Sequence, residues 1–238
     1  QKEIPSLAEK IISRVKSMHT DQPDFEEIQI DCDWSDKSKN NYFKLLEALK
    51  DVLGKNTILS ATIRLHQVKF STRTGVPPAD KGVLMAYNMA DINDVNTLNS
   101  ILEEDIIDQY TDNLHEYPLH LDLALPVYHQ NVLFRAGRYI GVWRDKNIFD
   151  PTISPIYFTP VGKNKFKCVQ DTFMHNMSIK KEDIVRVEKS ETKEIKNVCH
   201  SIQHQLKRDT FTLILFDINS SHLKNTPVED IKSIFHLP

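Results

Sequence analysis

Glycine is scarce in this sequence, with six residues among 238, and neither G-x-G-x-x-G nor a Walker pattern is present. Because loops of this kind commonly hold nucleotide phosphates, the sequence argues against a glycine-rich phosphate-binding loop. No apolar run approaches the roughly 20 residues that a membrane-spanning helix needs. The net charge of -3 gives no electrostatic support for binding to nucleic acid or to a membrane surface.

Cysteine is also rare, and the three residues Cys32, Cys168 and Cys199 form no C-x-x-C pair. We expect them to be small buried hydrophobic side chains rather than a disulfide framework. The ten histidines form no ligand cluster. His200 and His204 lie one turn apart on a predicted surface helix, where a chance pair is the better interpretation. The sequence therefore predicts neither a metal ion nor another cofactor.

The rest of the composition is typical of a globular protein, with 40% hydrophobic and 26% charged residues. The length suits one large domain or two small ones. The chain opens with Gln1 and runs directly into an amphipathic helix, so we expect that a signal, a pro-segment or a domain has been removed upstream. The sequence does not fix the compartment, for which export to the periplasm or the cell surface is the working hypothesis.

Strand-like and helix-like patterns alternate along most of the chain. Helical spacing of apolar residues predicts helices at 4–18, 40–53, 95–117, 192–206 and 228–235. Alternation of apolar and polar residues predicts strands at 27–34, 58–68, 82–89, 119–128 and 211–218, and a further apolar run at 132–142. This order is typical of a parallel sheet with right-handed crossovers. Residues 151–189 interrupt it with prolines and short strands, which predicts a small α+β insertion between 1–150 and 190–238.

The predicted strands have one apolar and one polar face. Polar residues become denser towards their carboxyl ends, where the sequence has Asp31, Asp33, Arg64, His66, Asp122, Tyr128, Asp217 and Asn219. In an open doubly wound sheet helices cover both faces, so its strands are continuously apolar. Polar residues at alternate positions instead need a shared polar interior, since isolated buried polar groups are costly. The sequence therefore predicts an α/β fold of the (β/α)8 TIM-barrel type, with its chemistry at the C-terminal mouth.

Three of the predicted strands carry recognisable motifs. Ile30–Ser35 reads Ile-Asp-Cys-Asp-Trp-Ser, Val83–Asn88 ends in Met-Ala-Tyr-Asn, and Leu121–Tyr128 ends in Ala-Leu-Pro-Val-Tyr. The first is similar to a signature in which two alternate aspartates precede an aromatic residue and a catalytic glutamate. The other two resemble Met-Ala-Tyr-Asp and Gly-hydrophobe-Pro-hydrophobe-Tyr strands. Together they resemble the family-18 chitinases, (β/α)-barrels of the glycoside hydrolase superfamily in which many members carry an α+β insertion before the last strand.

The resemblance covers nearly all of the chain and implies its place in the barrel. The segment corresponds to the C-terminal part, with about five strands, and the first three barrel strands are absent from it. We therefore expect an upstream segment or a partner to complete the barrel, because an unclosed parallel sheet exposes edges that tend to pair.

The sequence departs from the family pattern at the positions that carry the chemistry. Ile28 and Gln29 stand where the signature has Asp and Gly, and Asn88 replaces an aspartate. Ser35 stands where the family has its proton donor. In chitinases the acetamido group of the substrate attacks while that glutamate protonates the leaving oxygen. A serine hydroxyl cannot replace a carboxyl group in this step, so we expect the chitinase mechanism not to operate unchanged.

Asp31 and Asp33 are the candidate catalytic residues. Carboxylates at alternate strand positions point into one site and can divide acid and base roles if their surroundings separate their pKa values. The alternative is a structural ion-paired network in which Arg64 and His66 neutralise them.

The candidate substrate-binding residues are the polar and aromatic side chains at the predicted mouth, namely Trp34, Ser35, Arg64, His66, Tyr87, Asn88, Asp122, Tyr128, Asp217 and Asn219. Aromatic rings among them, with Trp143, can form platforms for sugars, but they can equally be core. Asp217 and Asn219 can instead cap the following loop through Ser220 and Ser221.

Three functions follow from these patterns. The first is a glycoside hydrolase that acts on a glycan at the barrel mouth. The second is a catalytically inactive chitinase-like module that binds a glycan or a protein there. The third is a purely structural or assembly role. The sequence leaves open whether the chain is an enzyme, and it predicts a carbohydrate ligand, no nucleic acid and no membrane span.

Overall fold

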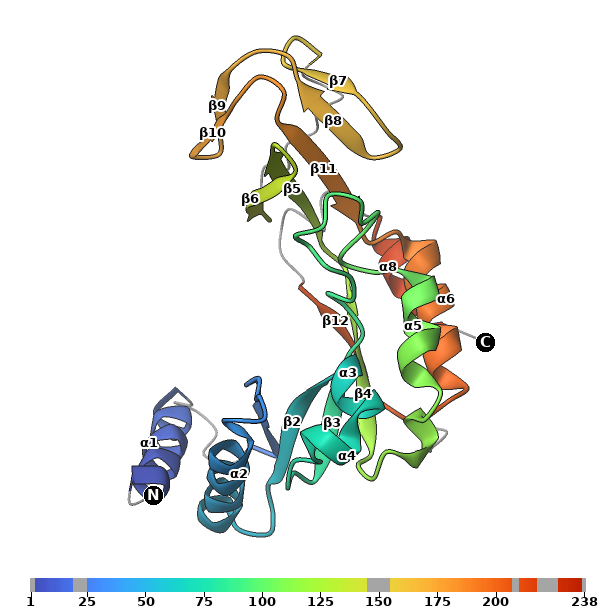
Figure 1. Cartoon of the computed structure of the whole chain (residues 1–238). Coiled ribbons are helices and arrows are strands. Elements are labelled where there is room, and N and C mark those ends of the chain that lie inside the picture. Colours follow the sequence, from blue (N-terminus) through green and yellow to red (C-terminus); the bar gives the residue numbers. More distant parts are fainter. Residues whose placement is uncertain (1–2, 19–24, 145–154, 207–209, 218–226, 237–238) are drawn as a thin grey trace. The chain divides into compact units, whose positions relative to one another are not determined.

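Strands and helices alternate through most of the chain (Figure 1). The computed structural model describes residues 3–18, 25–144, 155–206, 210–217 and 227–236. By its internal contacts the chain divides into two compact units. Unit 1 consists of Gln1–Met85, Tyr110–Leu123 and Gln203–Thr212, and unit 2 of Ala86–Gln109, Ala124–Ile202 and Leu213–Pro238.

Five strands form a sheet in the order β1-β2-β3-β4-β12. Their bounds are Glu27–Ile30 for β1, Ile58–Arg64 for β2, Lys81–Met85 for β3, Leu121–Pro126 for β4 and Leu213–Phe216 for β12. The pairs β1–β2 and β2–β3 are parallel. The backbone bonds of β4 to its neighbours advance in the same direction along both strands, from Gly82–His120 to Ala86–Ala124 and from Leu123–Thr212 to Val127–Phe216. The predicted parallel sheet of about five strands is therefore confirmed.

Helices form in the five regions where the apolar spacing predicts them. Their bounds are Glu3–Met18 for α1, Lys39–Leu53 for α2, Glu104–Thr111 for α5, Thr192–Gln203 for α6 and Val228–Ile234 for α8. In α2 the buried residues Tyr42, Leu46 and Leu49 recur at the spacing that puts them on one face, and α2 contacts both α1 and β2. Gly54 ends this helix with φ 75°, a conformation that favours glycine.

The strand predicted at 58–68 is four residues too long. It ends at Arg64, and the short helices α3 (Leu65–Lys69) and α4 (Ser71–Thr74) follow. The side chain of Gln67 accepts the Arg64 amide N–H at 2.7 Å, which satisfies a backbone donor at the turn into α3. His66 therefore lies in a helix rather than on the strand, because a local cap overrides the apolar alternation.

The helix predicted at 95–117 is also much shorter in the structure. It is limited to α5 and a 3-10 turn, Leu114–Glu116. Asp91 and Asp94 instead accept the amide N–H groups of Asn93 and Asn96, at 2.9 and 2.8 Å. Such side-chain bonds compete with helical backbone bonds, so the segment before α5 is a loop. In unit 2 α5 lies beside α6 (Figure 1), and Asn197 and Ser201 of α6 donate to Glu104 and Asp108.

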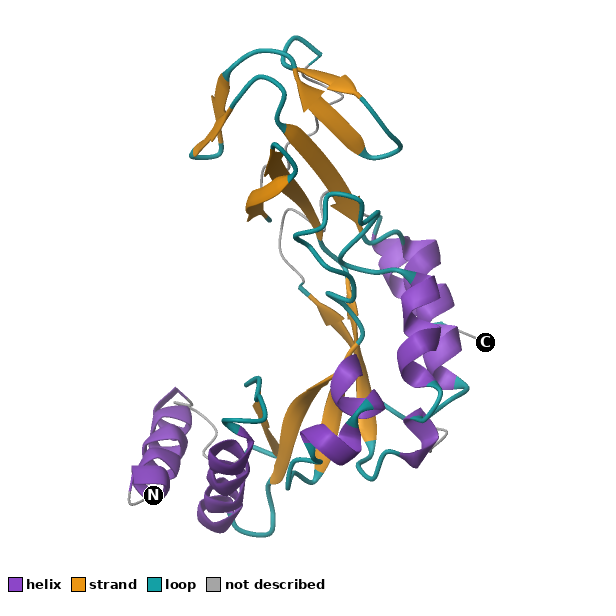
Figure 2. Cartoon of the chain, viewed as in Figure 1, coloured by secondary structure: helices purple, strands orange, loops and turns teal. Residues whose placement is uncertain are grey.

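A second, antiparallel sheet belongs to unit 2, with the order β6-β5-β11-β8-β7. The strands are β5 His129–Arg135, β6 Arg138–Trp143, β7 Phe158–Pro160, β8 Lys165–Cys168 and β11 Ile184–Lys189, and β9 Thr172–Met174 pairs with β10 Met177–Ile179. Its core contains Leu133, Trp143, Phe158, Cys168, Ile179 and Val185. The predicted insertion at 151–189 differs in two respects. The apolar run 132–142 belongs to the same sheet, since β5 pairs with β11, and the described residues 155–189 contain no helix (Figure 2).

The three cysteines are free thiols in the structure. Cys168 and Cys199 are buried, as predicted, whereas Cys32 is exposed, so the prediction was wrong for that residue. Burial raises the pKa of the Cys199 thiol to about 11. This thiol is therefore protonated at neutral pH and behaves as a small apolar side chain.

Gly82 in β3 provides a test of the packing between the strands of unit 1. A Cβ atom there would lie 2.7 Å from Leu121 Cδ2 and 2.9 Å from Ile63 Cγ1. We expect Gly82→Ala to lower the free energy of unfolding by about 2 kcal/mol, as measured by urea denaturation, because the core cannot accept the methyl group without displacement. The control is Gly141→Ala, where the same atom meets only the end of the Met177 side chain, with the terminal methyl at 2.7 Å and the sulfur at 3.8 Å. That flexible end can move aside, so equal losses for the two variants would contradict the prediction.

Candidate functional site

The predicted site residues fall in both units. Unit 1 contains Asp31, Asp33, Trp34, Ser35, Arg64, His66 and Asp122, and unit 2 contains Tyr87, Asn88, Tyr128 and Asp217. Asn219 lies outside the described residues. Within the described part of the chain, no group of three or more His, Cys, Asp or Glu could hold a metal ion. No helix of these residues has the length and apolar character needed to cross a membrane.

Asp33 forms a bidentate ion pair with Arg64 at the carboxyl ends of β1 and β2. The Nε atom of Arg64 donates to Oδ1 of Asp33 at 2.6 Å, and its Nη2 atom donates to Oδ2. The two side chains are 45% and 54% exposed for Arg64 and Asp33. Planar guanidinium groups match carboxylates in this way, which fixes orientation more than it adds stability at an exposed site. Both carboxylate oxygens of Asp33 therefore act as acceptors in this contact.

Asp31 is exposed and accepts one bond from β2, in which Thr62 Oγ1 donates to Oδ1 at 2.9 Å. The Thr62 side chain is buried, so this contact satisfies its hydroxyl group. His66, on α3, lies near the same ion pair. Desolvation and the positive charge of Arg64 lower the pKa of His66 below its ordinary value, although Asp33 opposes the shift. The imidazole is therefore neutral at pH 7 and does not share in neutralising the aspartates.

Trp34 lies in the core of unit 1 rather than at an open surface. Its ring stacks on Tyr42 with a centroid distance of 5.3 Å and an interplanar angle of 23°, and its indole N–H donates to the Thr74 carbonyl at 2.9 Å. A ring packed in this way offers no face to a sugar. Burial raises the pKa of Tyr42, and the charges of Cys32, Asp31 and Asp33 add to the shift.

Ser35 begins the turn into α2. Its carbonyl accepts the amide N–H groups of Ser38 and Lys39 at 3.0 and 2.8 Å. Its own amide N–H donates to Ser38 Oγ at 2.9 Å. The side chain is exposed, and its hydroxyl lies 3.3 Å from Ser38 Oγ. This position therefore presents a hydroxyl group at the start of a helix.

Asp122 lies at the amino ends of the strands of unit 1, opposite to the end that carries Asp33 and Arg64. Its carboxylate accepts from Lys81 Nζ and from the Thr212 amide, both at 2.7 Å, and Lys81 also contacts Glu27 at 2.8 Å. Burial alone would raise the pKa of Asp122, but the hydrogen bonds from Lys81 and Thr212 outweigh it and lower the pKa below its ordinary value. The amino-end position follows from the register, since Lys81 and Glu27 are the first residues of their strands.

A group of aromatic and polar side chains gathers at the carboxyl ends of the strands in unit 2, and we call Tyr87, Asn88, Tyr128, Arg144 and Phe216 the Tyr128 cluster. The rings of Tyr87 and Phe216 stack with a centroid distance of 4.8 Å and an interplanar angle of 5°. Tyr128 meets Phe216 edge-on at 6.0 Å. Phe216 is 39% exposed, so part of this aromatic stack faces solvent. Asp217 follows Phe216 directly and is exposed.

Polar contacts complete the cluster around Tyr128. Its hydroxyl donates to Asn88 Oδ1 at 2.6 Å, and the guanidinium carbon of Arg144 lies 5.0 Å from the centre of its ring. Burial raises the pKa of Tyr128 above its ordinary value, so the hydroxyl stays protonated and acts as a donor. Asn88 is exposed and has φ 54°, a left-handed conformation that asparagine tolerates better than most residues.

The comparisons with known proteins bear on the fold. No family model and no curated protein matches the sequence. A chitinase from Chromobacterium violaceum matches over 99% of this chain and 74% of its own, with a TM-score of 0.58 and 13% identity. The chain has a chitinase-like glycoside hydrolase fold. A family-18 N-acetylglucosaminidase from Paenibacillus barengoltzii matches at 10% identity over 98% of this chain and 76% of its own, with a TM-score of 0.52.

A third similar structure is the spore cortex-lytic enzyme SleL of Bacillus cereus, with a TM-score of 0.54 and 11% identity over 90% of this chain and 50% of that enzyme. These matches confirm the TIM-barrel-like fold class and the resemblance predicted from the three strand motifs. At identities of 10% to 13% they establish the fold, and the chemistry depends on the residues of this chain.

Sequence reasoning missed three residues of these groups. Phe216 ends the last strand of the sheet directly before Asp217, and an aromatic residue at a strand end was the available signal. Arg144 follows β6 without any motif, and Thr62 looked like an ordinary polar strand position. The contacts of Arg144 and Thr62 join segments distant in the sequence, which the local pattern does not reveal.

The ion pair of Asp122 leads to a prediction about stability. We expect Asp122→Asn to lower the free energy of unfolding by about 3 kcal/mol at pH 7, because it leaves the partly buried Lys81 without one of its two carboxylate partners. The pKa of Asp122 is lowered in the folded state, so its contribution is complete above the unfolded pKa near ~4 and is lost as the pH falls through the lower folded value. The difference in free energy of unfolding between the parent protein and Asp122→Asn, measured by urea denaturation, should therefore become smaller in acid.

Asp33→Asn is the matched control, because it breaks a bidentate pair that is exposed. We expect a change within about 1 kcal/mol, since solvent screens such pairs. A loss as large as that of Asp122→Asn, or a deficit for Asp122→Asn that grows in acid, would show that these electrostatic assignments are wrong.

Proposed function

We propose that this chain is a chitinase-like glycan-binding protein that does not hydrolyse glycosidic bonds by the chitinase mechanism. The observation that carries the proposal is the state of the residues in the signature segment. Ser35 stands at the position of the family's proton donor, and Asp33 has both carboxylate oxygens bound to Arg64. Protonation of a leaving oxygen needs a carboxylic acid in reach of it, and neither residue supplies one.

The binding half of the proposal is supported by the Tyr128 cluster. Sugar rings have apolar faces and a rim of hydroxyl and acetamido groups, so a site for them combines an aromatic surface with fixed polar groups. The stack of Tyr87 and Phe216 provides the aromatic surface, and Phe216 is partly exposed. Asn88 provides an exposed amide whose orientation is held by Tyr128. An oligosaccharide of N-acetylglucosamine is the ligand class that the resemblance to chitinases suggests.

A glycoside hydrolase that uses Asp31 and Asp33 is the second candidate. It is favoured by the exposure of both carboxylates at the carboxyl ends of the strands, where barrel enzymes have their catalytic residues. This candidate requires that the pair of Asp33 and Arg64 opens during the reaction. It predicts slow release of reducing ends that is abolished by Asp31→Asn.

We expect isothermal titration with the N-acetylglucosamine tetramer to show saturable binding, and a reducing-end assay on the same mixture to stay silent. Phe216→Ala should weaken binding about tenfold, because it removes the exposed ring of the stack. The matched control is Phe173→Ala, which removes a ring that is 69% exposed on the β9–β10 hairpin. This control should bind like the parent protein.

The outcomes separate the candidates. Hydrolysis that Asp31→Asn abolishes would replace the binding proposal with the enzymatic one. Absence of binding to the tetramer, or equal effects of Phe216→Ala and Phe173→Ala, would remove the support for a sugar platform and favour a structural role.

A further inference from the structure

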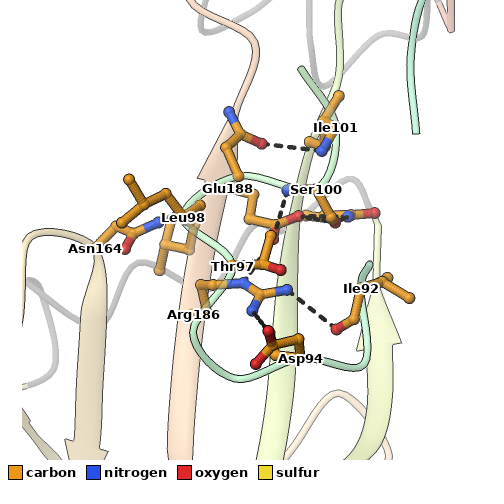
Figure 3. Close-up of polar contacts among 12 residues, drawn as sticks. Ile92, Asp94, Thr97, Leu98, Ser100, Ile101, Asn164, Arg186 and Glu188 are labelled. Carbon is orange, nitrogen blue, oxygen red and sulfur yellow. Dashed lines mark hydrogen bonds and ion pairs between the residues drawn. The ribbon is translucent and has the colours of Figure 1, made fainter. Parts of the chain in front are cut away.

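A buried carboxylate joins the loop at residues 91–101 to strand β11 of the antiparallel sheet. The side chains of Arg186 and Glu188 are both 0% exposed and form an ion pair at 2.6 Å. Figure 3 shows how the loop wraps around these two side chains. A charged pair in this position is costly unless every remaining donor and acceptor finds a partner.

Glu188 uses both oxygens fully. Its Oε1 atom accepts from the Ser100 amide at 3.0 Å and from Arg186 Nε at 2.6 Å. Its Oε2 atom accepts from Ser100 Oγ at 2.7 Å and from Gln130 Nε2 at 2.6 Å. Four donors on two oxygens match the capacity of an ionised carboxylate, whereas an amide in the same place would oppose donors with its own N–H groups.

Arg186 holds the other part of the loop. Its two terminal nitrogens donate to the carbonyls of Asp94 at 2.6 Å and Ile92 at 3.1 Å (Figure 3). Its guanidinium carbon lies 4.9 Å from the centre of the Phe134 ring. The guanidinium group thus binds two carbonyls of this loop, and the carbonyl of Asp94 also accepts the Thr97 amide N–H at 3.2 Å. These bonds connect the loop to β11.

One branch of this network leads from Glu188 to Asn88 through the backbone. Ser100, held by Glu188, accepts the Met89 amide N–H with its carbonyl at 3.0 Å. The next carbonyl, that of Ile101, accepts the Asn88 amide N–H at 2.8 Å. These two bonds fix the residue that has the left-handed backbone and accepts the hydroxyl bond of Tyr128.

A second branch leads from Glu188 to Arg144 through a side-chain amide. Gln130 donates to Glu188 with Nε2, so its Oε1 atom faces the other way and accepts from Arg144 Nε at 2.8 Å. Arg144 in turn lies over the ring of Tyr128. If Glu188 became an amide, its NH2 group would face either the Ser100 amide and Arg186 Nε or the Ser100 hydroxyl and Gln130 Nε2. In the second orientation Gln130 would have to reverse to supply an acceptor, and Arg144 would then face an N–H group instead of its acceptor.

We propose that Glu188, on β11 of the antiparallel sheet, is a positioning residue for the Tyr128 cluster. It sets the place of Asn88 through Ser100 and the place of Arg144 through Gln130, and both residues converge on Tyr128. The inference rests on the proposed function for its ligand, because the cluster is the sugar platform proposed above. The proposal gives the antiparallel sheet a role in positioning the residues of that platform.

The test compares local protection with affinity in Glu188→Gln. We expect amide hydrogen exchange at Asn88 and Met89 to become at least about tenfold faster, because the loop carbonyls that hold these amides lose their anchor. Titration with the N-acetylglucosamine tetramer should show binding about tenfold weaker. Ser100→Ala is the milder variant if Glu188→Gln does not fold, since it keeps the backbone bond to Glu188 and should accelerate the same two amides several-fold.

Asp183→Asn is the matched control, at the residue directly before β11. Asp183 is buried and accepts two bonds from Arg135, at 3.0 and 2.8 Å, but it has no described bond to the loop at 91–101. We expect Asp183→Asn to lower the melting temperature about as much as Glu188→Gln does. Amide exchange at Asn88 and Met89, and the affinity for the tetramer, should stay within about twofold of the parent protein. A purely structural role for Glu188 predicts that both variants change these readouts equally.

The proposal is overturned if Asn88 and Met89 stay as protected in the Glu188 and Ser100 variants as in the parent protein, or if Asp183→Asn exposes them equally. The exchange experiment needs no ligand. If the parent protein fails to bind the tetramer, the proposed function is lost, while the exchange data still decide whether Glu188 holds Asn88 in place.

Discussion

A polar group that leaves water must find its partner inside the protein, and this requirement organises both units of the chain. The strands carry polar residues on faces that are buried, among them Asp122, Arg186 and Glu188. Each of these residues is placed by the donors and acceptors that it meets. The apolar residues determine where strands and helices form, and the buried polar residues then determine which segments lie together.

Local sequence pattern was sufficient for much of the fold. The alternation at 27–34 and 58–68 predicts two strands, which the structure has at Glu27–Ile30 and Ile58–Arg64. The helical spacing at 40–53 predicts α2, and the order of elements predicts the parallel sheet. Errors arise where a side chain competes with the backbone. Gln67 caps the turn after Arg64 and ends a strand early, and Asp91 and Asp94 form turns in a segment with helical spacing. Patterns of apolar and polar residues do not reveal such single side-chain to backbone hydrogen bonds, so the element ends that depend on them are predicted wrongly.

The candidate site was less predictable, because the place of a residue along its strand does not show which side chains from other segments lie next to it. The family motifs identified Tyr87, Asn88 and Tyr128, which do gather in one cluster. The signature motif also chose Trp34, as its aromatic residue, and the polar alternation chose Asp122. Trp34 instead packs on Tyr42, and Asp122 meets Lys81 at the amino ends of the strands. A pattern of period two identifies a face, and it does not specify which end of the sheet a residue occupies or which helix covers it.

The span of the contacts made by Arg186 affects how the protein can be synthesised. Its guanidinium group bonds to carbonyls that precede it by 94 and 92 residues. During translation the segment around Ile92 therefore emerges from the ribosome well before the residue that satisfies it. Contacts of such long separation form late, after the loop-closure entropy has been overcome. The segment around Ile92 stays solvated until β11 has been synthesised. A nascent chain arrested before Arg186 therefore lacks the side chains of Arg186 and Glu188 that bind this loop.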